Sequence, residues 1–498
     1  MSDRTAATGT HAPSEFVKAL TLTDATMLVA GSMIGSGIFI VSADISRTLG
    51  SPGWLLLAWI VTGIVTVLGA LAFGELAAMY PRAGGTYIFL RESMGPLMGF
   101  LYGWTLFIVI QTGTIAAVAV GFGKFLGVLF PAVTADRWML AYDFKTSGSS
   151  IEFGLSWQRV AALVTIWVLT WVNLRGVKEG KWVQTVLTFI KTASLALLIL
   201  LALSIGRNAD AIAANFGAGN FFAGTPDLGA LFAVTFGSAL VGSLFSADSW
   251  TSPTFAAAEV QNPSRNLPRA LLIGTSLVTL LYVLANVSYL MVLPLHGAAE
   301  GATVMARGID HATQDRVATA VMESIFGSSG GLIMAAAILV STFGCNNGLI
   351  LSGARVYYAM ARDGLFFARA GVLSEHGVPS YALVVQSVWT SLLCLTGTYN
   401  QLLDYVIFAA LLFYALTTIG LFLLRRRRPN EPRPYKAIGY PVLPALYALS
   451  AAGVAVTLLL AGKTRVQALS GLAIVLLGVP VYLVWRRGSS AGATGAGA

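Results

Sequence analysis

The feature that most constrains this fold is a series of apolar stretches, each long enough to cross a bilayer. A membrane-spanning helix needs about 20 apolar residues. The chain is 56% hydrophobic and 11% charged, whereas soluble domains are typically about 25% charged. The stretches lack the short alternating pattern of transmembrane β-strands. The sequence therefore predicts an all-α membrane protein.

Twelve spans are predicted, joined by loops too short to hold a soluble domain. They cover residues 22–46, 54–79, 97–130, 157–174, 182–205, 229–258, 268–293, 330–360, 381–398, 402–424, 441–461 and 467–485. The polar segment before the first span lacks the apolar core of a cleavable signal, so we expect that span to remain as a helix.

The positions of the basic residues predict the orientation. With a cytoplasmic N-terminus, about 20 Lys and Arg residues fall inside and about 10 outside, as the positive-inside rule requires. We therefore expect a multi-pass protein of the cytoplasmic membrane with both termini in the cytoplasm. The run Arg425–Arg428 is interpreted as a topology anchor, with recognition of anionic lipid as the alternative.

The first span contains a glycine-rich segment. Gly31, Gly35 and Gly37 alternate with serines in the middle of an apolar stretch, and glycine weakens a helix. Gly31 and Gly35 also have the four-residue spacing that lets two helices pack closely. The segment alone does not distinguish a broken helix from a packing face.

The sixth span has a matching weak point. Asp248 lies among hydroxyl side chains in an apolar segment, and Pro253 removes a helix hydrogen bond. An ionisable group at membrane depth costs about 2.5–3.5 kcal/mol on insertion scales, so it usually faces a cavity or a partner. Weakened helices five spans apart are typical of a transporter site at the interface of two inverted repeats.

Broken helices expose backbone groups that recognise charge. The N–H groups near Gly35, Ser36 and Gly37 suit a carboxylate, and the C=O groups near Met33 and Phe245 suit an ammonium. A zwitterionic amino acid satisfies both. The predicted substrate-binding residues are Met33, Ile34, Gly35, Ser36, Gly37, Phe245, Ser246, Asp248 and Trp250.

Several segments resemble the amino acid–polyamine–organocation superfamily, and within it the bacterial relatives of the L-type amino acid transporters. They follow the family's order between about residues 20 and 485. The segments are GSMIGSGIF (31–39), ELAAMYPRAGGTY (75–87), NLRGVK (173–178), NPSRNLPRA (262–270), ARDG (361–364), PYK (434–436) and GYP (439–441).

This resemblance implies the leucine-transporter fold, with five-plus-five inverted repeats and alternating access. The expected parts are a cytoplasmic tail (1–20), a first repeat (21–205), a second repeat (206–428), two additional helices (429–487) and a disordered tail (488–498). The family's substrate-backbone role maps onto Met33, Ser36, Gly37, Phe245 and Ser246. Phe245 also matches an aromatic gate over the substrate, and simple core packing is its alternative role.

Lys191 lies in the middle of the fifth span, with no acidic residue within helical reach. A buried unpaired lysine is costly, so it should meet carbonyls or a cavity, unless its stem lets the ammonium reach an interface. It resembles the fifth-span lysine of sodium-independent relatives, whose ammonium takes the place of a bound cation. We expect Ser341, Thr342 and Asn346 as its neighbours. The resemblance then implies exchange, uniport or proton coupling.

Asp248 departs from the family, whose sixth-span break is usually richer in glycine. It is equally consistent with binding a cationic substrate group and with accepting from nearby backbone N–H groups. Cationic amino acids, polyamines and other amines therefore remain alternative substrates. Glu75, near the end of the second span, is interpreted as structural.

Other classes of protein are less consistent with the sequence. It contains no HExxH, no paired Cys/His ligands and no phosphate loop, so we predict no catalytic residue, metal or cofactor. The net charge of +9 fits membrane topology better than nucleic-acid binding. A channel would need a repeated filter or charged rings, whereas a transporter-like nutrient receptor stays open. Both cysteines, Cys345 and Cys394, lie in apolar segments, so no covalently linked accessory subunit is expected.

Overall fold

The computed structural model describes residues 16–146, 149–223, 229–396, 399–462 and 464–494, and almost all of them lie in helices or their connections. The longer helices are α1 (Leu22–Met33), α2 (Ser42–Leu49), α3 (Pro52–Met79), α4 (Thr86–Met94), α5 (Pro96–Thr105), α6 (Gln111–Leu129), α7 (Trp157–Leu174), α8 (Val177–Ser204), α9 (Ala209–Phe216), α10 (Ala230–Ser246), α12 (Pro263–Val292), α14 (Val317–Arg362), α15 (Ser380–Thr396), α16 (Tyr399–Arg427), α17 (Val442–Leu460) and α18 (Arg465–Thr494). Short turns of helix include η1 (Gly37–Phe39), α11 (Ser252–Phe255), η3 (Ala257–Glu259), α13 (Val304–Arg307), η4 (Thr313–Asp315) and η5 (Ala368–Gly371), and η2 (Leu106–Ile110) is a π turn that joins α5 to α6.

Within the described residues, eight helical stretches are long and apolar enough to cross a membrane. They are α3, the continuous α5–α6 stretch, α8, α12, α14, α16, α17 and α18, and each coincides with a predicted span. The other predicted spans are also helical: α7 and α15 are shorter, and the first and sixth spans are each divided into two helical parts. The polytopic helical architecture is therefore confirmed.

Two features differ from the predicted all-α chain. Residues Trp138–Thr146 (β1) and Ser149–Ser156 (β2) form an antiparallel hairpin in the connection between the third and fourth spans. Aromatic and charged residues alternate along β1, which is the period of a strand rather than of a helix. In addition, α18 continues to Thr494, into the segment predicted as a disordered tail, while residues 495–498 lie outside the described part.

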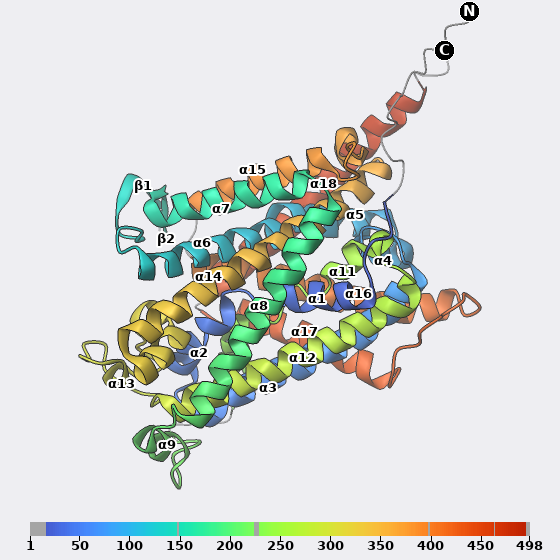
Figure 1. The fold of residues 1–498 in the computed structure, drawn as a ribbon. Coiled ribbons are helices and arrows are strands. Elements are labelled where there is room, and N and C mark those ends of the chain that lie inside the picture. The colour runs from blue at the N-terminus through green and yellow to red at the C-terminus, as the bar shows by residue number, and fades with distance from the viewer. Residues whose placement is uncertain (1–15, 147–148, 224–228, 397–398, 463, 495–498) are drawn as a thin grey trace, which may run out of the picture.

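The connections gather at two opposite ends of the helical bundle (Figure 1). The hairpin, α9 and α13 lie at one end, called here the hairpin end. Phe16 lies at the other, because its ring contacts that of Tyr358 near the end of α14, with centroids 4.9 Å apart. Arg486 of α18 lines a pocket with Asp363 at this same terminal end.

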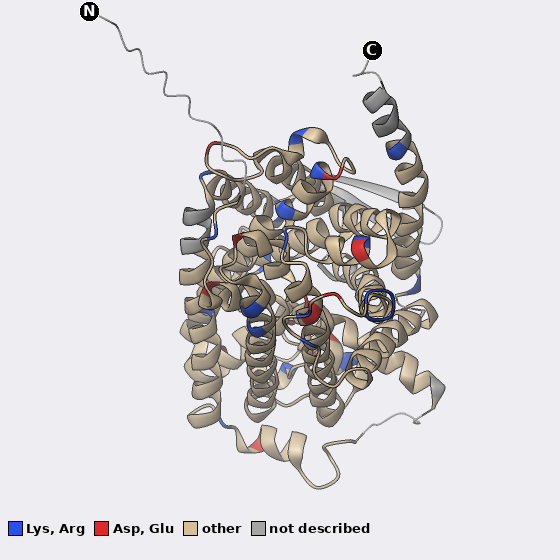
Figure 2. Ribbon diagram, turned by 90° about the vertical axis from the view of Figure 1, so that its right-hand side faces the viewer, with Lys and Arg blue, Asp and Glu red and all other residues tan. Residues whose placement is uncertain are grey.

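The outer surface of the bundle is apolar. Trp167, Val168 and Trp171 of α7 are each more than two-fifths exposed, and α18 exposes Leu476 and Leu477 in the same way. Figure 2 shows how sparsely charged residues are distributed over the helices. Exposed apolar stripes on peripheral helices are expected where lipid is the solvent.

Glu75 joins three segments at the terminal end. Its carboxylate is fully buried, accepts from Arg425 of α16 at 2.9 Å and lies 3.2 Å from Arg433. It also accepts the N–H of Ala437 at 2.7 Å. These contacts agree with the structural role predicted for Glu75. They also show that the run Arg425–Arg428, interpreted as an anchor, takes part in tertiary packing.

The helix α1 lies in the centre of the bundle, in contact with α8, α12 and α14 (Figure 1). The helix α10 packs against α2, α3 and α17. The helix α10 also contacts η1, the turn that follows α1. The break after α1 and the helix α10 therefore meet inside the protein, where water cannot satisfy their backbone groups.

Candidate functional site

The predicted break in the first span is confirmed. The helix α1 ends at Met33, and Ile34 leaves the helical conformation with φ −74° and ψ 90°. One 3₁₀ turn, η1, follows before α2 begins at Ser42. All of these residues are buried, so the carbonyls at this helix end need donors from other parts of the bundle.

The sixth span is also broken. The helix α10 ends at Ser246, and α11 begins only at Ser252. Ser249 in the connection has φ 65°, a left-handed conformation that favours glycine. Pro253 lies in the first turn of α11, where a missing N–H costs nothing. The expectation that Pro253 removes a helix hydrogen bond is therefore wrong, and the proline instead marks the start of the second half-helix.

Glycines let the two breaks approach closely. A Cβ atom on Gly37 would overlap the hydroxyl of Ser246 and lie 2.8 Å from its Cβ. A Cβ atom on Gly35 would lie 3.1 Å from the Sγ of Cys345 in α14. The close contact between the breaks thus depends on the absence of a side chain at Gly37.

Lys191 of α8 caps the end of α1. Its side chain is fully buried, and its ammonium donates to the carbonyls of Gly31 and, at 2.9 Å, Ile34. A third carbonyl, that of Ser341, lies at 3.5 Å. The alternative that Lys191 reaches an interface is therefore wrong: its ammonium is held by backbone oxygens at the break.

The three predicted neighbours of Lys191 do not share one environment. The hydroxyl of Ser341 donates to the carbonyls of Ile34 and Gly35 in the break, at 3.2 and 3.3 Å. Thr342 instead donates within its own helix at 2.9 Å. The amide of Asn346, in its favourable orientation, bonds the backbone of α6. Adjacent positions on a helix point in different directions, so only Ser341 of the three contacts the break.

Two residues of the site were missed by the sequence analysis, and Cys345 is the first. It lies four residues after Ser341, on the same helical face. Its thiol donates to the carbonyl of Ser32 at 3.1 Å. Helical spacing from Ser341 was a signal that could have identified it.

Tyr282 of α12 is the second missed residue. Its hydroxyl donates to the carbonyl of Met33 at 2.9 Å and to that of Ser246 at 3.0 Å. It thereby bridges the carbonyl ends of α1 and α10. The carbonyl of Phe245 accepts the N–H of Asp248 within the connection at 3.1 Å, and its predicted role toward an ammonium stays a prediction. No local pattern in the seventh span identified Tyr282.

The backbone N–H groups of the first break have fewer hydrogen-bond partners than its carbonyls. Those of Gly35 and Gly37 meet no acceptor among the residues that the structure describes, although both residues are buried. Ser36 lies between them and is fully buried. Buried N–H groups are costly without an acceptor, and together they suit a carboxylate.

A described partner of the Asp248 carboxylate lies in α16. This carboxylate accepts from the hydroxyl of Tyr414 at 2.6 Å. A cavity of about 20 Å³, which admits about one water, lies between Asp248, Thr66 of α3 and Tyr447 of α17. Trp250 packs on the ring of Tyr414, with centroids 5.6 Å apart. Phe245 is buried at the end of α10, and its assignment as gate or core stays a prediction.

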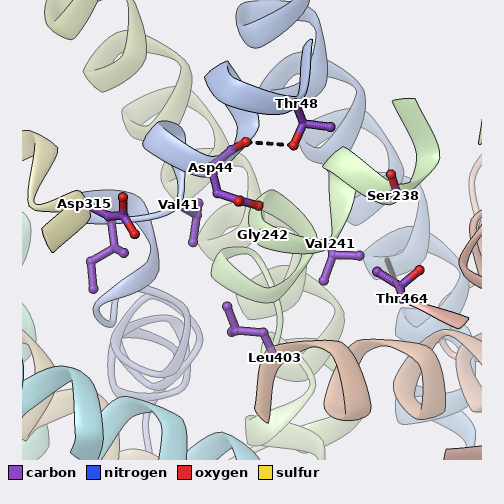
Figure 3. A pocket seen from close by; sticks show the side chains of 10 residues that line it. Val41, Asp44, Thr48, Ser238, Val241, Gly242, Asp315, Leu403 and Thr464 are labelled. Carbon is purple, nitrogen blue, oxygen red and sulfur yellow. Dashed lines mark hydrogen bonds between the residues drawn. The ribbon is translucent and has the colours of Figure 1, made fainter. Parts of the chain in front are cut away.

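A pocket of about 50 Å³ lies on the hairpin-end side of the breaks, between α2 and α10 (Figure 3). Val41, Asp44, Gly242 and Asp315 are among the residues that line it. Arg47 pairs with both carboxylates, at 2.7 Å from Asp315 and 3.7 Å from Asp44. In the described part of the chain, no cluster of three or more His, Cys, Asp or Glu residues could hold a metal ion.

Comparison with known proteins adds independent information. Residues 20–481 match the family described as "Amino acid permease". The large neutral amino acids transporter small subunit 2 of Homo sapiens is 33% identical over 471 residues, covering 94% of this chain and 80% of the relative. The serine/threonine exchanger SteT of Bacillus subtilis is 30% identical over 472 residues, covering 93% and 96%. The b(0,+)-type amino acid transporter 1 of Mus musculus is 29% identical over 435 residues, covering 85% and 79%.

Proposed function

The chain belongs to the amino acid permease family, and we propose that it carries amino acids across the cytoplasmic membrane by alternating access. The observation that carries this proposal is the pair of buried helix breaks. They bring N–H groups without acceptors at Gly35 and Gly37 close to the carbonyl ends at Met33 and Ser246.

One amino acid fits both kinds of group. Its carboxylate would accept from the N–H groups of Gly35, Ser36 and Gly37, where the helix dipole also favours negative charge. Its ammonium would donate to the carbonyls of Met33 and Ser246, because each carbonyl oxygen has two lone pairs. Backbone groups then recognise the part that all amino acids share, and the side chain determines specificity elsewhere.

We further propose that transport does not use sodium. The ammonium of Lys191 already lies among the carbonyls of Gly31, Ile34 and Ser341. Backbone oxygens of this kind would otherwise suit a small cation. The similarity to a bacterial serine/threonine exchanger favours exchange, and proton coupling is the alternative.

The proposed topology has twelve spans in five-plus-five inverted repeats, with two additional helices. The two breaks occur in the first and sixth spans, as that symmetry requires. Basic side chains at the terminal end, including Arg91, Arg428 and Arg486, support a cytoplasmic location for this end. Both termini would then be cytoplasmic.

We propose that no accessory subunit is linked by a disulfide. Of the relatives compared above, the human transporter is named a small subunit, whereas the name of the bacterial exchanger mentions no subunit. In this chain, however, the only two cysteines are Cys345 and Cys394, and both are buried. Transport by the purified chain alone would support this proposal.

A cationic substrate is the second candidate. Asp248 is a buried carboxylate beside the sixth-span break, and no basic side chain of the described residues forms an ion pair with it. Its carboxylate is already bonded by the hydroxyl of Tyr414 in α16, so we rank neutral amino acids first.

Proteoliposomes containing the purified protein test the proposed function. Uptake of labelled amino acid should be stimulated by unlabelled amino acid inside and should be unchanged when choline replaces sodium. A competition panel of neutral amino acids, cationic amino acids and polyamines then identifies the substrate class. Binding without accumulation would indicate a receptor instead, and uptake that requires sodium would contradict the assignment of Lys191.

A further inference from the structure

The hydroxyl of Tyr282 lies where the two broken helices end. It reaches the carbonyls of Met33 and Ser246, at 2.9 and 3.0 Å. The side chain is 2% exposed, and the ring of Trp59 packs against it with centroids 5.4 Å apart. The hydroxyl is therefore held in place between two elements that are not adjacent in the sequence.

No other donor among the described residues serves these two carbonyls. Lys191 and the hydroxyl of Ser341 serve the carbonyls of Gly31, Ile34 and Gly35. A buried carbonyl without a donor is costly. The carbonyls of Met33 and Ser246 thus depend on Tyr282 unless a ligand supplies a donor.

A hydroxyl and an ammonium differ in how well they can serve two acceptors. Tyrosine has one proton, which the two carbonyls must share in a three-centre bond. The ammonium of an amino acid has three N–H groups and a positive charge, so it satisfies both carbonyls by itself. The hydroxyl matters most when no ammonium is present.

We propose that Tyr282 takes the place of the substrate's ammonium, so that the transporter can close and change its orientation without substrate. The proposal rests on the proposed function. Tyr282 is then a positioning residue for the empty carrier, and it sets the balance between net transport and exchange. In exchange, the transporter reorients with substrate bound in both directions, and the substrate's ammonium makes the hydroxyl unnecessary. In net transport, the transporter must reorient once in each cycle without bound substrate.

The test compares Tyr282→Phe with the wild type in proteoliposomes of the full chain. This change removes the hydroxyl and keeps the ring that packs on Trp59. We expect efflux of labelled amino acid into medium without substrate to fall about tenfold, the effect of leaving buried carbonyls without a donor. Exchange with amino acid outside should stay within about twofold of the wild type.

Tyr289→Phe is the matched control. Tyr289 lies on the same helix, is fully buried and donates to a carbonyl of the first break, that of Ile38, at 3.3 Å. It does not bridge the two breaks. Its loss should leave the ratio of net transport to exchange unchanged.

A second measurement is the shift in melting temperature on adding substrate. The shift should be larger in Tyr282→Phe than in the wild type, because the ammonium restores the missing donor. Equal loss of both activities, with or without loss of folded protein, would overturn the proposal, since the hydroxyl would then be needed in every state. Unchanged net transport would also overturn it. A wild type that exchanges amino acid but releases none into medium without substrate would overturn it as well, because its empty carrier would not reorient. A wild type that transports no amino acid in either assay would instead refute the proposed function.

Discussion

Replacing Lys191 by methionine removes the ammonium from the first break but keeps most of the apolar stem. The carbonyl of Ile34 would keep a donor, because the hydroxyl of Ser341 also reaches it at 3.2 Å. The carbonyl of Gly31 would lose its donor, since the N–H one turn later, that of Gly35, does not bond it. The substitution therefore leaves one buried carbonyl unsatisfied.

One such carbonyl costs about 1–3 kcal/mol. If this cost falls on the closed state through which every cycle passes, exchange should slow by about 5- to 150-fold. The apparent KM should change less than the maximal rate, because the substrate's own contacts with the break are kept. The assay is exchange of labelled amino acid in proteoliposomes, with rates measured over a range of substrate concentrations.

Lys191→Arg serves as the matched variant, since it keeps a charged donor in nearly the same place and should retain more activity than Lys191→Met. Full turnover by Lys191→Met would refute the reasoning, because it would show that the break closes without this donor. An equal loss of exchange activity in both variants would show that the activity depends on the length and shape of the lysine side chain rather than on a charged donor.

Further predictions concern individual residues of the fold and site. Gly37→Ala should abolish transport, because its Cβ has no room in the neighbouring break, whereas Gly453→Ala, with open space around it, should transport normally. Ser249→Gly should relieve the left-handed strain and raise stability by about 0.5–1 kcal/mol, seen as a higher melting temperature; an unchanged or lower value would contradict this. Glu75→Gln should destabilise the protein by about 2 kcal/mol, less than a fully buried pair because Arg425 is partly exposed. A melting temperature within error of the wild type would show that the ion pair contributes nothing.

The spans and their breaks were predictable because their signals are local. Apolar length identified the helices, and Gly31, Gly35, Gly37 and Pro253 marked where two of them weaken. The same reasoning missed the β1–β2 hairpin, since a short alternating segment carries little weight beside long apolar runs.

The partners of the breaks were harder to predict. Lys191 was identified because a buried lysine is rare, but its acceptors Gly31 and Ile34 lie more than 150 residues away in the chain. Asn346 was expected near Lys191, but its amide bonds the backbone of α6, whereas Cys345 at helical spacing from Ser341 contacts the segment around the break.

The sequence by itself determined that this is a helical membrane protein of the amino acid permease family with two interrupted spans, because hydropathy and helix weakness are properties of neighbouring residues. Only the tertiary structure decided which side chains donate hydrogen bonds to the backbone carbonyls at those two breaks. Tyr282 shows why: a tyrosine in an apolar helix carries no local sign of its hydrogen bonds. The hydroxyl meets Met33 and Ser246 because three separate helices converge, and buried carbonyls must find a donor wherever packing places one.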